Sequence, residues 1–182
     1  LAERLIASEE PVTILIDGHE AEISEYLIKK LPNARVVMDG GSLRASNIKL
    51  AAWTDYFVVS EHFARDYMSY RSLSTEAEIK AALIELNKIC RGEAFITLGE
   101  KGCAFLKSGM LQIVPSWLCN AVDTTGAGDV FHGAFTYGVH YSMHIDNIIL
   151  ICQPCTAAHF SLTQKRVWES MKSGPGGRPP LG

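Results

Sequence analysis

The stretch Asp123-Thr-Thr-Gly-Ala-Gly-Asp129-Val-Phe-His-Gly-Ala-Phe135 decides how this sequence is interpreted. Small residues at positions 126–128 let backbone N–H groups approach an anion, and the apolar helix predicted from there to about His140 adds its positive dipole end. Such a nest suits terminal phosphates or the charge that develops during phosphoryl transfer. A carboxylate in the same turn, Asp129, would be placed to take a proton from an attacking hydroxyl. The residues alone leave open an ordinary glycine-rich loop, with Asp129 as a charge at a helix start.

Short apolar runs rich in β-branched residues precede this stretch, and helical patterns separate them. The predicted strands are 12–16, 35–38, 56–59 and 94–98, with helices at 20–31, 61–70 and 74–90, the last of them closed by Arg91-Gly92. A hairpin of 103–106 and 111–114 follows, and a last helix covers about 145–162. This alternation predicts an α/β fold whose mostly parallel sheet has helices on both faces.

Composition sets the limits of this interpretation. The chain has 182 residues, of which 47% are hydrophobic and 20% charged, with a formal net charge of −3. These values fit one compact domain, predicted at residues 1–163, followed by a flexible Gly/Pro-rich tail at 164–182. Disorder throughout is excluded by the apolar content. Nucleic-acid and membrane partners are not indicated, because they usually require a clustered positive face.

The cysteines indicate a reducing compartment. Their number is odd and they are scattered through apolar segments, so we predict reduced core residues of a cytoplasmic protein: Cys90, Cys103, Cys119, Cys152 and Cys155. The pair at 152 and 155 has redox spacing, but a lone C-x-x-C inside a helical run is weak support for a redox or zinc site.

Residues 123–135 resemble the second signature of the ribokinase-like (PfkB) carbohydrate kinases, and they agree with its pattern D-T-x-G-A-G-D-x-F-x-G-A-F. Ile96-Thr-Leu-Gly99-Glu-Lys-Gly102 is similar to the family's nucleotide loop T-L-G-x-x-G, and 39–44 and 55–60 resemble its central strands. The resemblance runs from about Val12 to about Thr163. It implies a ribokinase-like three-layer fold of which this chain holds the C-terminal two thirds.

The resemblance implies ATP-dependent phosphorylation of a primary hydroxyl of a small carbohydrate. Asp129 matches the base that activates this hydroxyl, and the N–H groups of Gly126, Ala127 and Gly128 match the anion hole. The ATP site would be lined by Thr97, Gly99, Gly102, Ser60 and Cys155, with Cys155 facing the adenine. Asp123 and Thr125 match positions that hold a monovalent cation such as K⁺ in members that need one, and Mg²⁺ would bridge the phosphates. The expected partners are the sugar and ATP, with a homodimer left open.

Two departures from the family pattern matter. Many members carry Asn-x-x-Glu after the strand that ends here at Val59, where it organises water around Mg²⁺, whereas this chain has Ser60-Glu61-His62-Phe63. Ketohexokinase-like members also lack the full motif, which favours a keto-sugar or related small carbohydrate over a nucleoside. The second departure is that nothing here matches the family's first third, which carries the sugar-binding strands, a Gly-Gly motif and a β-sheet lid. Since the chain starts at Leu1 with no Met, we expect a fragment or a processed form.

Two alternatives belong to other functional classes. A non-catalytic nucleotide-binding or scaffold protein on the same fold is favoured by both departures and disfavoured by the intact Asp129. A nicotinamide-binding Rossmann protein is disfavoured, because Asp17-Gly-His-Glu20 follows the first strand where G-x-G-x-x-G would be needed. His132, one turn into the signature helix, is interpreted as structural.

Overall fold

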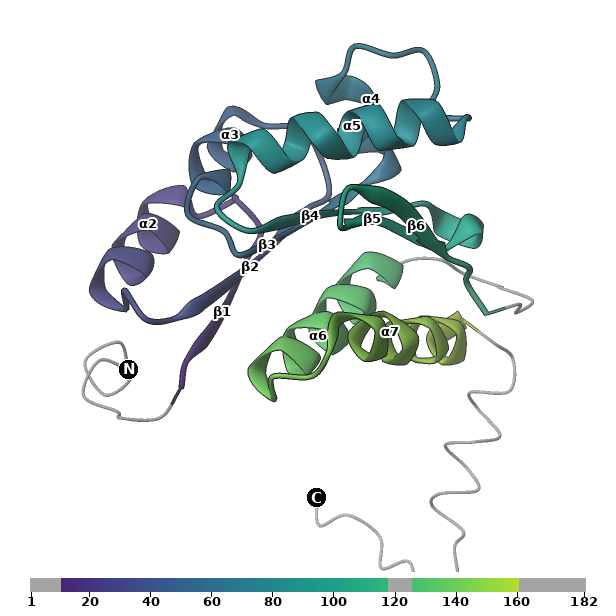
Figure 1. Cartoon of the computed structure of the whole chain (residues 1–182). Coiled ribbons are helices and arrows are strands. Elements are labelled where there is room, and N and C mark those ends of the chain that lie inside the picture. Colours follow the sequence, from purple (N-terminus) through teal and green to yellow (C-terminus); the bar gives the residue numbers. More distant parts are fainter. Residues whose placement is uncertain (1–10, 118–125, 161–182) are drawn as a thin grey trace, which may run out of the picture.

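The computed structural model describes residues 11–117 and 126–160, and the side chains of the last helix as far as Gln153. Six strands form one sheet in which the spatial order follows the chain order (Figure 1). They are β1 (Thr13–Ile16), β2 (Arg35–Gly40), β3 (Tyr56–Ser60), β4 (Glu93–Thr97), β5 (Cys103–Lys107) and β6 (Met110–Val114). Strands β1 to β4 are parallel, while β5 and β6 are antiparallel to their neighbours. The predicted fold class is therefore confirmed.

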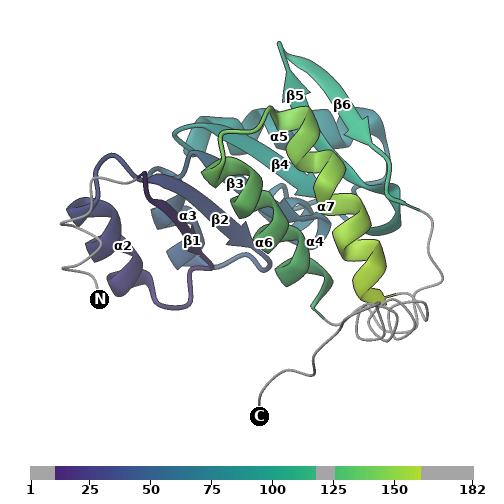
Figure 2. The ribbon, with the colours of Figure 1, turned by 90° about the horizontal axis from the view of Figure 1, so that it is seen from below.

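Helices cover both faces of this sheet. One face carries α2 (Ala21–Lys30), α3 (Ala45–Ala51), α4 (Glu61–Tyr67) and α5 (Glu76–Ile89). The other face carries α6 (Ala127–His140) and α7 (Ile145–Phe160), which lie side by side (Figure 2). A short 3₁₀ turn, η1 (Gly99–Lys101), connects β4 to β5. In the described residues, no helix is long and apolar enough to span a bilayer.

Alternating side chains along the buried strands divide the core into two layers. In β2, Val36 and Met38 belong to the cluster under α2 to α5, whereas Val37 belongs to the cluster under α6 and α7. The aromatic centre of the second cluster is Phe95, whose ring lies 5.1 Å from that of Phe135. This period of two is expected of strands that are buried on both faces.

Helix α6 is fixed to β2 at its carboxyl end. The guanidinium of Arg35 donates to the carbonyl oxygen of Val139 and to Ser142 Oγ, the latter at 2.8 Å. A cation at this end of a helix also interacts favourably with the helix dipole. These hydrogen bonds orient α6 so that its amino end points to the opposite edge of the sheet, where the parallel strands have their carboxyl ends.

Most predicted elements are confirmed, with three corrections. Helix α3 was not predicted, and α4 ends at Tyr67 rather than near residue 70. The start of α5 is the expected cap, in which Thr75 and Glu78 form reciprocal hydrogen bonds. Its end is not a glycine cap, because Gly92 instead lies so close to Asp55 that a Cβ would come within 2.0 Å of that residue's carbonyl oxygen. The predicted tail at 164–182 lies outside the described residues.

Candidate functional site

Polar residues gather where the parallel strands end. Asp17 follows β1, Asp39 is the penultimate residue of β2, and Ser60 and Thr97 close β3 and β4. Because all four strands run in the same direction, these residues share one edge of the sheet. In open α/β sheets the carboxyl edge is where ligands bind.

The amino end of α6 faces this edge. Gly126 is its N-cap in the left-handed region, with φ +79°, and the helix begins at Ala127, so the predicted helix start is confirmed. The first N–H groups of a helix have no partner within the helix, and they carry its positive dipole end. Gly128 and Asp129 are exposed in this first turn. The geometry therefore fits an anion nest with a carboxylate beside it.

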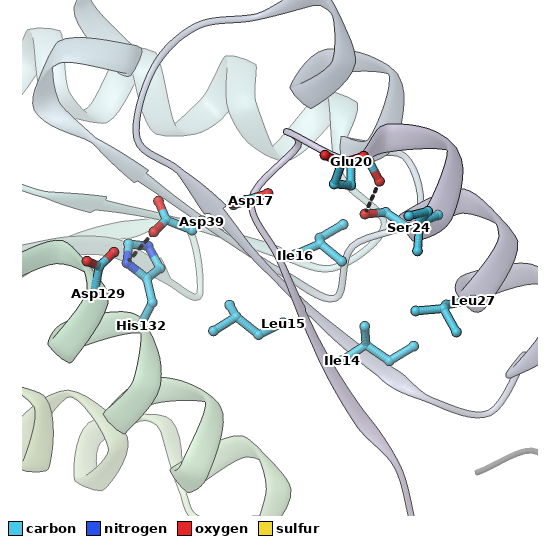
Figure 3. Close-up of a pocket in the computed structure, with 11 residues that line it drawn as sticks. Ile14, Leu15, Ile16, Asp17, Glu20, Ser24, Leu27, Asp39, Asp129 and His132 are labelled. Atoms are coloured by element: carbon cyan, nitrogen blue, oxygen red, sulfur yellow. Dashed lines mark hydrogen bonds and ion pairs between the residues drawn. The ribbon is translucent and has the colours of Figure 1, made fainter. Parts of the chain in front are cut away.

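A hollow with a volume of about 440 Å³ opens next to Asp129. Asp17, Asp39 and His132 line it together with Asp129, so the hollow brings β1, β2 and α6 together (Figure 3). Its remaining wall is largely apolar and comes from β1 and α2, through Ile14, Leu15, Ile16, Ile23 and Leu27. Four carboxylate residues line the hollow beside this apolar wall: Asp17, Glu20, Asp39 and Asp129. The combination suits a small ligand that carries several hydroxyl donors and a C–H face.

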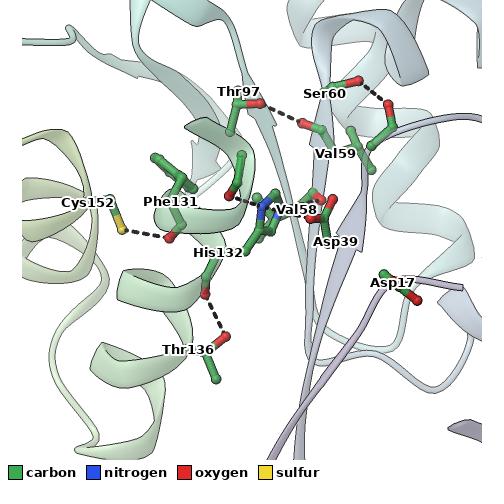
Figure 4. A network of polar contacts seen from close by, with 12 residues as sticks. Asp17, Asp39, Val58, Val59, Ser60, Thr97, Phe131, His132, Thr136 and Cys152 are labelled. Atoms are coloured by element: carbon green, nitrogen blue, oxygen red, sulfur yellow. Dashed lines mark hydrogen bonds and ion pairs between the residues drawn. The ribbon is translucent and has the colours of Figure 1, made fainter. Parts of the chain in front are cut away.

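His132 is the buried centre of a polar network at this site (Figure 4). Its side chain is 5% exposed. Nδ1 lies 2.6 Å from the carbonyl oxygen of Gly128 and 3.2 Å from Asp39 Oδ2. Nε2 lies 3.2 Å from the carbonyl oxygen of Val58. One side chain thus joins the first turn of α6 to both β2 and β3.

The carboxylates of the hollow differ in their electrostatics. Burial raises the pKa of Asp39 above its usual value of 3.8, the His132 side chain opposes this rise, and the charges of Asp129 and Asp17 add to it. The pKa of Asp17 is lowered instead, first by the hydrogen bond from the His19 backbone N–H. Asp39 is therefore a carboxylate held at a place that disfavours its charge.

The predicted nucleotide loop closes the same edge beyond β4. Thr97 Oγ1 donates to the carbonyl oxygen of Val59 at 3.4 Å. Gly99 and Gly102 both have positive φ, at +59° and +104°. A Cβ on Gly102 would come within 1.9 Å of the Val114 carbonyl oxygen, whereas one on Gly99 would meet nothing within 4 Å. Gly102 is thus required by the fold, and Gly99 leaves open space for a ligand.

Ser60 has a structural partner on each side. Its Oγ caps α4 by accepting from the Phe63 N–H at 3.0 Å, and it donates to the Gly41 carbonyl oxygen at 2.8 Å. Glu61 is the first residue of α4, at the carboxyl edge. The hydroxyl therefore holds the ends of β2 and β3 together beside the predicted nucleotide site.

Some predicted site residues lie outside the described part of the chain, and for another the side chain is not described. Asp123 and Thr125 lie outside the described residues, and so does Cys119. Cys155 belongs to α7, and its side chain is not among those described. Burial raises the pKa of the Cys103 thiol to about 12 and that of Cys90 to about 11, as expected of inert core thiols. Within 11–117 and 126–160 no cluster of three His, Cys, Asp or Glu side chains could hold a metal ion.

Sequence reasoning missed Asp17 and Asp39 as residues of the site. From the sequence, the first is placed only in the segment after the first strand, and the second only in the segment 39–44 that resembles the family's central strands. A signal was available, because each carboxylate lies at the end of a predicted parallel strand, and such ends converge on one edge.

Comparison with known proteins gives a consistent result. The family described as pfkB family carbohydrate kinase matches residues 42–170. The ribokinase of Lactococcus lactis is 27% identical over 144 residues, covering 79% of this chain and 44% of that protein. The deoxyribokinase of Salmonella typhi is 30% identical over 132 residues, covering 72% of this chain and 42% of that protein. The chain thus spans less than half the length of these curated relatives.

Solved structures share the fold. The ribokinase of Thermotoga maritima superposes with a TM-score of 0.71 at 20% identity, covering 88% of this chain and 52% of that one. The Arabidopsis thaliana ribokinase, complexed with ribose and ATP, gives a TM-score of 0.69 at 19% identity, covering 80% and 48%. At these identities the likeness establishes the fold alone.

Proposed function

Because the chain belongs to the pfkB family of carbohydrate kinases, we propose that it carries the phosphoryl-transfer centre of an enzyme that phosphorylates a primary hydroxyl of a small carbohydrate with ATP. The observation that supports this most directly is the position of Asp129. It lies in the exposed first turn of α6 and lines a hollow shared with three further carboxylate residues, Asp17, Glu20 and Asp39.

In the proposed reaction Asp129 accepts the proton of the attacking hydroxyl. The new bond joins that oxygen to the γ-phosphorus, the bond from the γ-phosphorus to the bridging oxygen breaks, and ADP leaves with the electron pair. The N–H groups of residues 126–128 stabilise the charge on the transferring group. A positioned base of this kind typically contributes on the order of 10²–10⁴-fold to the rate.

ATP would approach along the loop after β4. The resemblance to the family's nucleotide loop assigns Gly99 to this site, and the space where its side chain would be is open to a ligand. Thr97 and Gly102 shape the same loop through their contacts with Val59 and Val114. Ser60 would bound the site from the β3 side, and Cys155 would face the adenine from α7.

Mg²⁺ would arrive with the nucleotide. This ion is usually held by phosphates and waters with one or two carboxylates rather than by a protein cage, which agrees with the lack of a three-ligand cluster in the described residues. Glu61, the first residue of α4, is one carboxylate at the carboxyl edge that would meet this need in part. When bound, Mg²⁺ would neutralise charge on the phosphates.

The hollow favours a sugar as the acceptor. Carboxylates accept hydrogen bonds from hydroxyl groups, and Asp17 and Asp39 present two of them beside the proposed base. The apolar wall of β1 and α2 would cover a C–H face of the ring. The replaced Asn-x-x-Glu motif leads us to favour a keto-sugar or a related small carbohydrate over a nucleoside.

The test is to express the protein from its complete coding sequence and screen a panel of aldo-sugars, keto-sugars and nucleosides for ADP release. Sugar-dependent turnover that Asp129→Asn abolishes is the expected result. ATP binding without turnover of any acceptor would instead support the non-catalytic scaffold.

A further inference from the structure

We propose that Asp39 and His132 form a positioning pair that holds the first turn of α6, and with it Asp129, against the carboxyl edge of the sheet. The inference rests on the proposed function, because it assigns the pair to the geometry of that phosphoryl-transfer centre. The two residues lie 93 positions apart in the sequence, yet no other side chain in the described network joins this turn to both β2 and β3.

The pair acts through the Gly128 peptide. His132 Nδ1 lies 2.6 Å from the Gly128 carbonyl oxygen, and that carbonyl shares a planar peptide unit with the Asp129 N–H. Fixing the direction of the carbonyl therefore fixes the orientation of the N–H and the start of the Asp129 backbone. The contact therefore acts directly on the backbone of the proposed base, and it acts on the amide nest through Gly128, the last residue of that nest.

The sheet supplies a rigid platform for the imidazole. Asp39 and Val58 are direct partners across β2 and β3, and His132 contacts both, through the carboxylate of one and the carbonyl of the other. Val58 is fully buried, and Gly128 belongs to the helix itself. The ring is thus held from two neighbouring strands and from its own first turn.

Both ring nitrogens of His132 face hydrogen-bond acceptors. Each described polar atom that faces the ring is an acceptor: the Gly128 and Val58 carbonyls and the Asp39 carboxylate. With hydrogen on Nδ1, the ring donates one N–H that the Gly128 carbonyl oxygen and the Asp39 carboxylate share. The other charges near the pair come from Asp17 after β1 and Asp129 on α6.

The charge on Asp39 is disfavoured where it lies, and this favours a functional role for the pair. Burial and the neighbouring carboxylates disfavour the charge on Asp39, with His132 only opposing them. Buried ion pairs can often be replaced by neutral groups without loss of stability. Residues that cost stability beside a reactive centre are typical of positions kept for activity.

The decisive experiment measures Asp39→Asn, His132→Gln and the variant that combines these two changes. The control is Tyr137→Phe, an exposed position further along the same helix. We expect each single variant to lower kcat by on the order of 10–100-fold, since small misplacements at a reacting centre can cost about 10²-fold. KM for ATP should stay within a few-fold in each variant. KM for the sugar should also rise in Asp39→Asn, because that carboxylate lines the proposed acceptor hollow. The double variant should be about as slow as the slower single variant, because both changes break one unit. Tyr137→Phe should leave kcat unchanged.

Nuclear magnetic resonance gives a readout that needs no turnover. In protein with ¹⁵N-labelled histidine, we expect Nδ1 of His132 to carry hydrogen in the wild type, and its signal to change in Asp39→Asn. Backbone amide signals of residues 126–130 should shift or broaden in the Asp39 and His132 variants, and not in Tyr137→Phe.

Two results would overturn the pair as a positioning device: a wild type whose Nδ1 of His132 carries no hydrogen, or variants that lose stability while kcat per folded molecule is unchanged. A wild type that phosphorylates no sugar but shows both resonance signatures would refute the proposed function. It would still support the inference that the pair holds the first turn of α6.

Discussion

Asp39 and Val58 are direct partners across β2 and β3, and the imidazole of His132 bridges them at 3.2 Å from the carboxylate of one and 3.2 Å from the carbonyl of the other. This bridge connects the sheet to the helix turn that carries Asp129. The site is therefore held together by contacts between segments far apart in the sequence.

The stability of the protein should report the cost of the Asp39 carboxylate. The folded pKa of Asp39 lies above its usual value of 3.8, so the unfolded chain releases this proton first as pH rises. Stability contributed by this group is present below the usual value and is lost as pH rises through the folded value. The wild type should therefore lose stability across this interval, and Asp39→Asn should not. The free energy of unfolding of the variant minus that of the wild type, measured in urea at several pH values, should rise across the interval and then stay constant. A difference that does not change with pH would contradict the assignment.

The open space at Gly99 allows a matched test of the nucleotide loop. Gly99 and Gly109 both have positive φ, at +59° and +76°, and a Cβ on either meets nothing within 4 Å. Alanine at either position should cost a similar amount of stability, about 1 kcal/mol, because both backbones are left-handed. Only Gly99→Ala should weaken ATP binding, measured by calorimetry. Equal ATP affinities in the two variants would remove Gly99 from the nucleotide site.

Most of the fold could be predicted from the sequence, because buried β-branched runs and capped helices are local signals. Helix α3 could not. It has seven residues, too few to show a clear helical period, and Arg44 gives it no side-chain cap. Its stability comes from burial of Asn47, Leu50 and Ala51 against the rest of the protein, which is a tertiary effect.

The site was predictable in part. The nest and Asp129 follow from a contiguous motif, and the helix start at Ala127 is where that motif requires it. His132 was expected to be structural, and its buried contacts agree with a structural component. Its link to Asp39 depends on the packing of α6 over β2, and no local pattern encodes that packing.

Expression of residues 1–182 alone tests how the activity is distributed along the protein. The chain spans 44% and 42% of the two curated relatives, and β1 has a neighbour on one side only in the described sheet, with Leu15 43% exposed. We expect partial ATP binding, no sugar phosphorylation and a tendency to associate through the open strand. Robust turnover of any sugar by this chain would show that the acceptor site is complete within it.

Potassium should raise the activity of the protein expressed from its complete coding sequence. Asp123 and Thr125 are proposed to hold a monovalent cation beside the amide nest, where its charge would favour anion binding. Initial rates in potassium, sodium and a bulky organic cation at equal ionic strength provide the measurement. Equal rates in the three salts would discard the cation site.

The most direct test of the account is the rate of a single turnover in Asp129→Asn. The amide keeps the shape of the side chain and cannot accept the hydroxyl proton. With ATP and the preferred sugar bound, the account predicts transfer slower by on the order of 10²–10⁴-fold, with ATP affinity retained. A transfer rate near that of the wild type would contradict the role of Asp129 as the base.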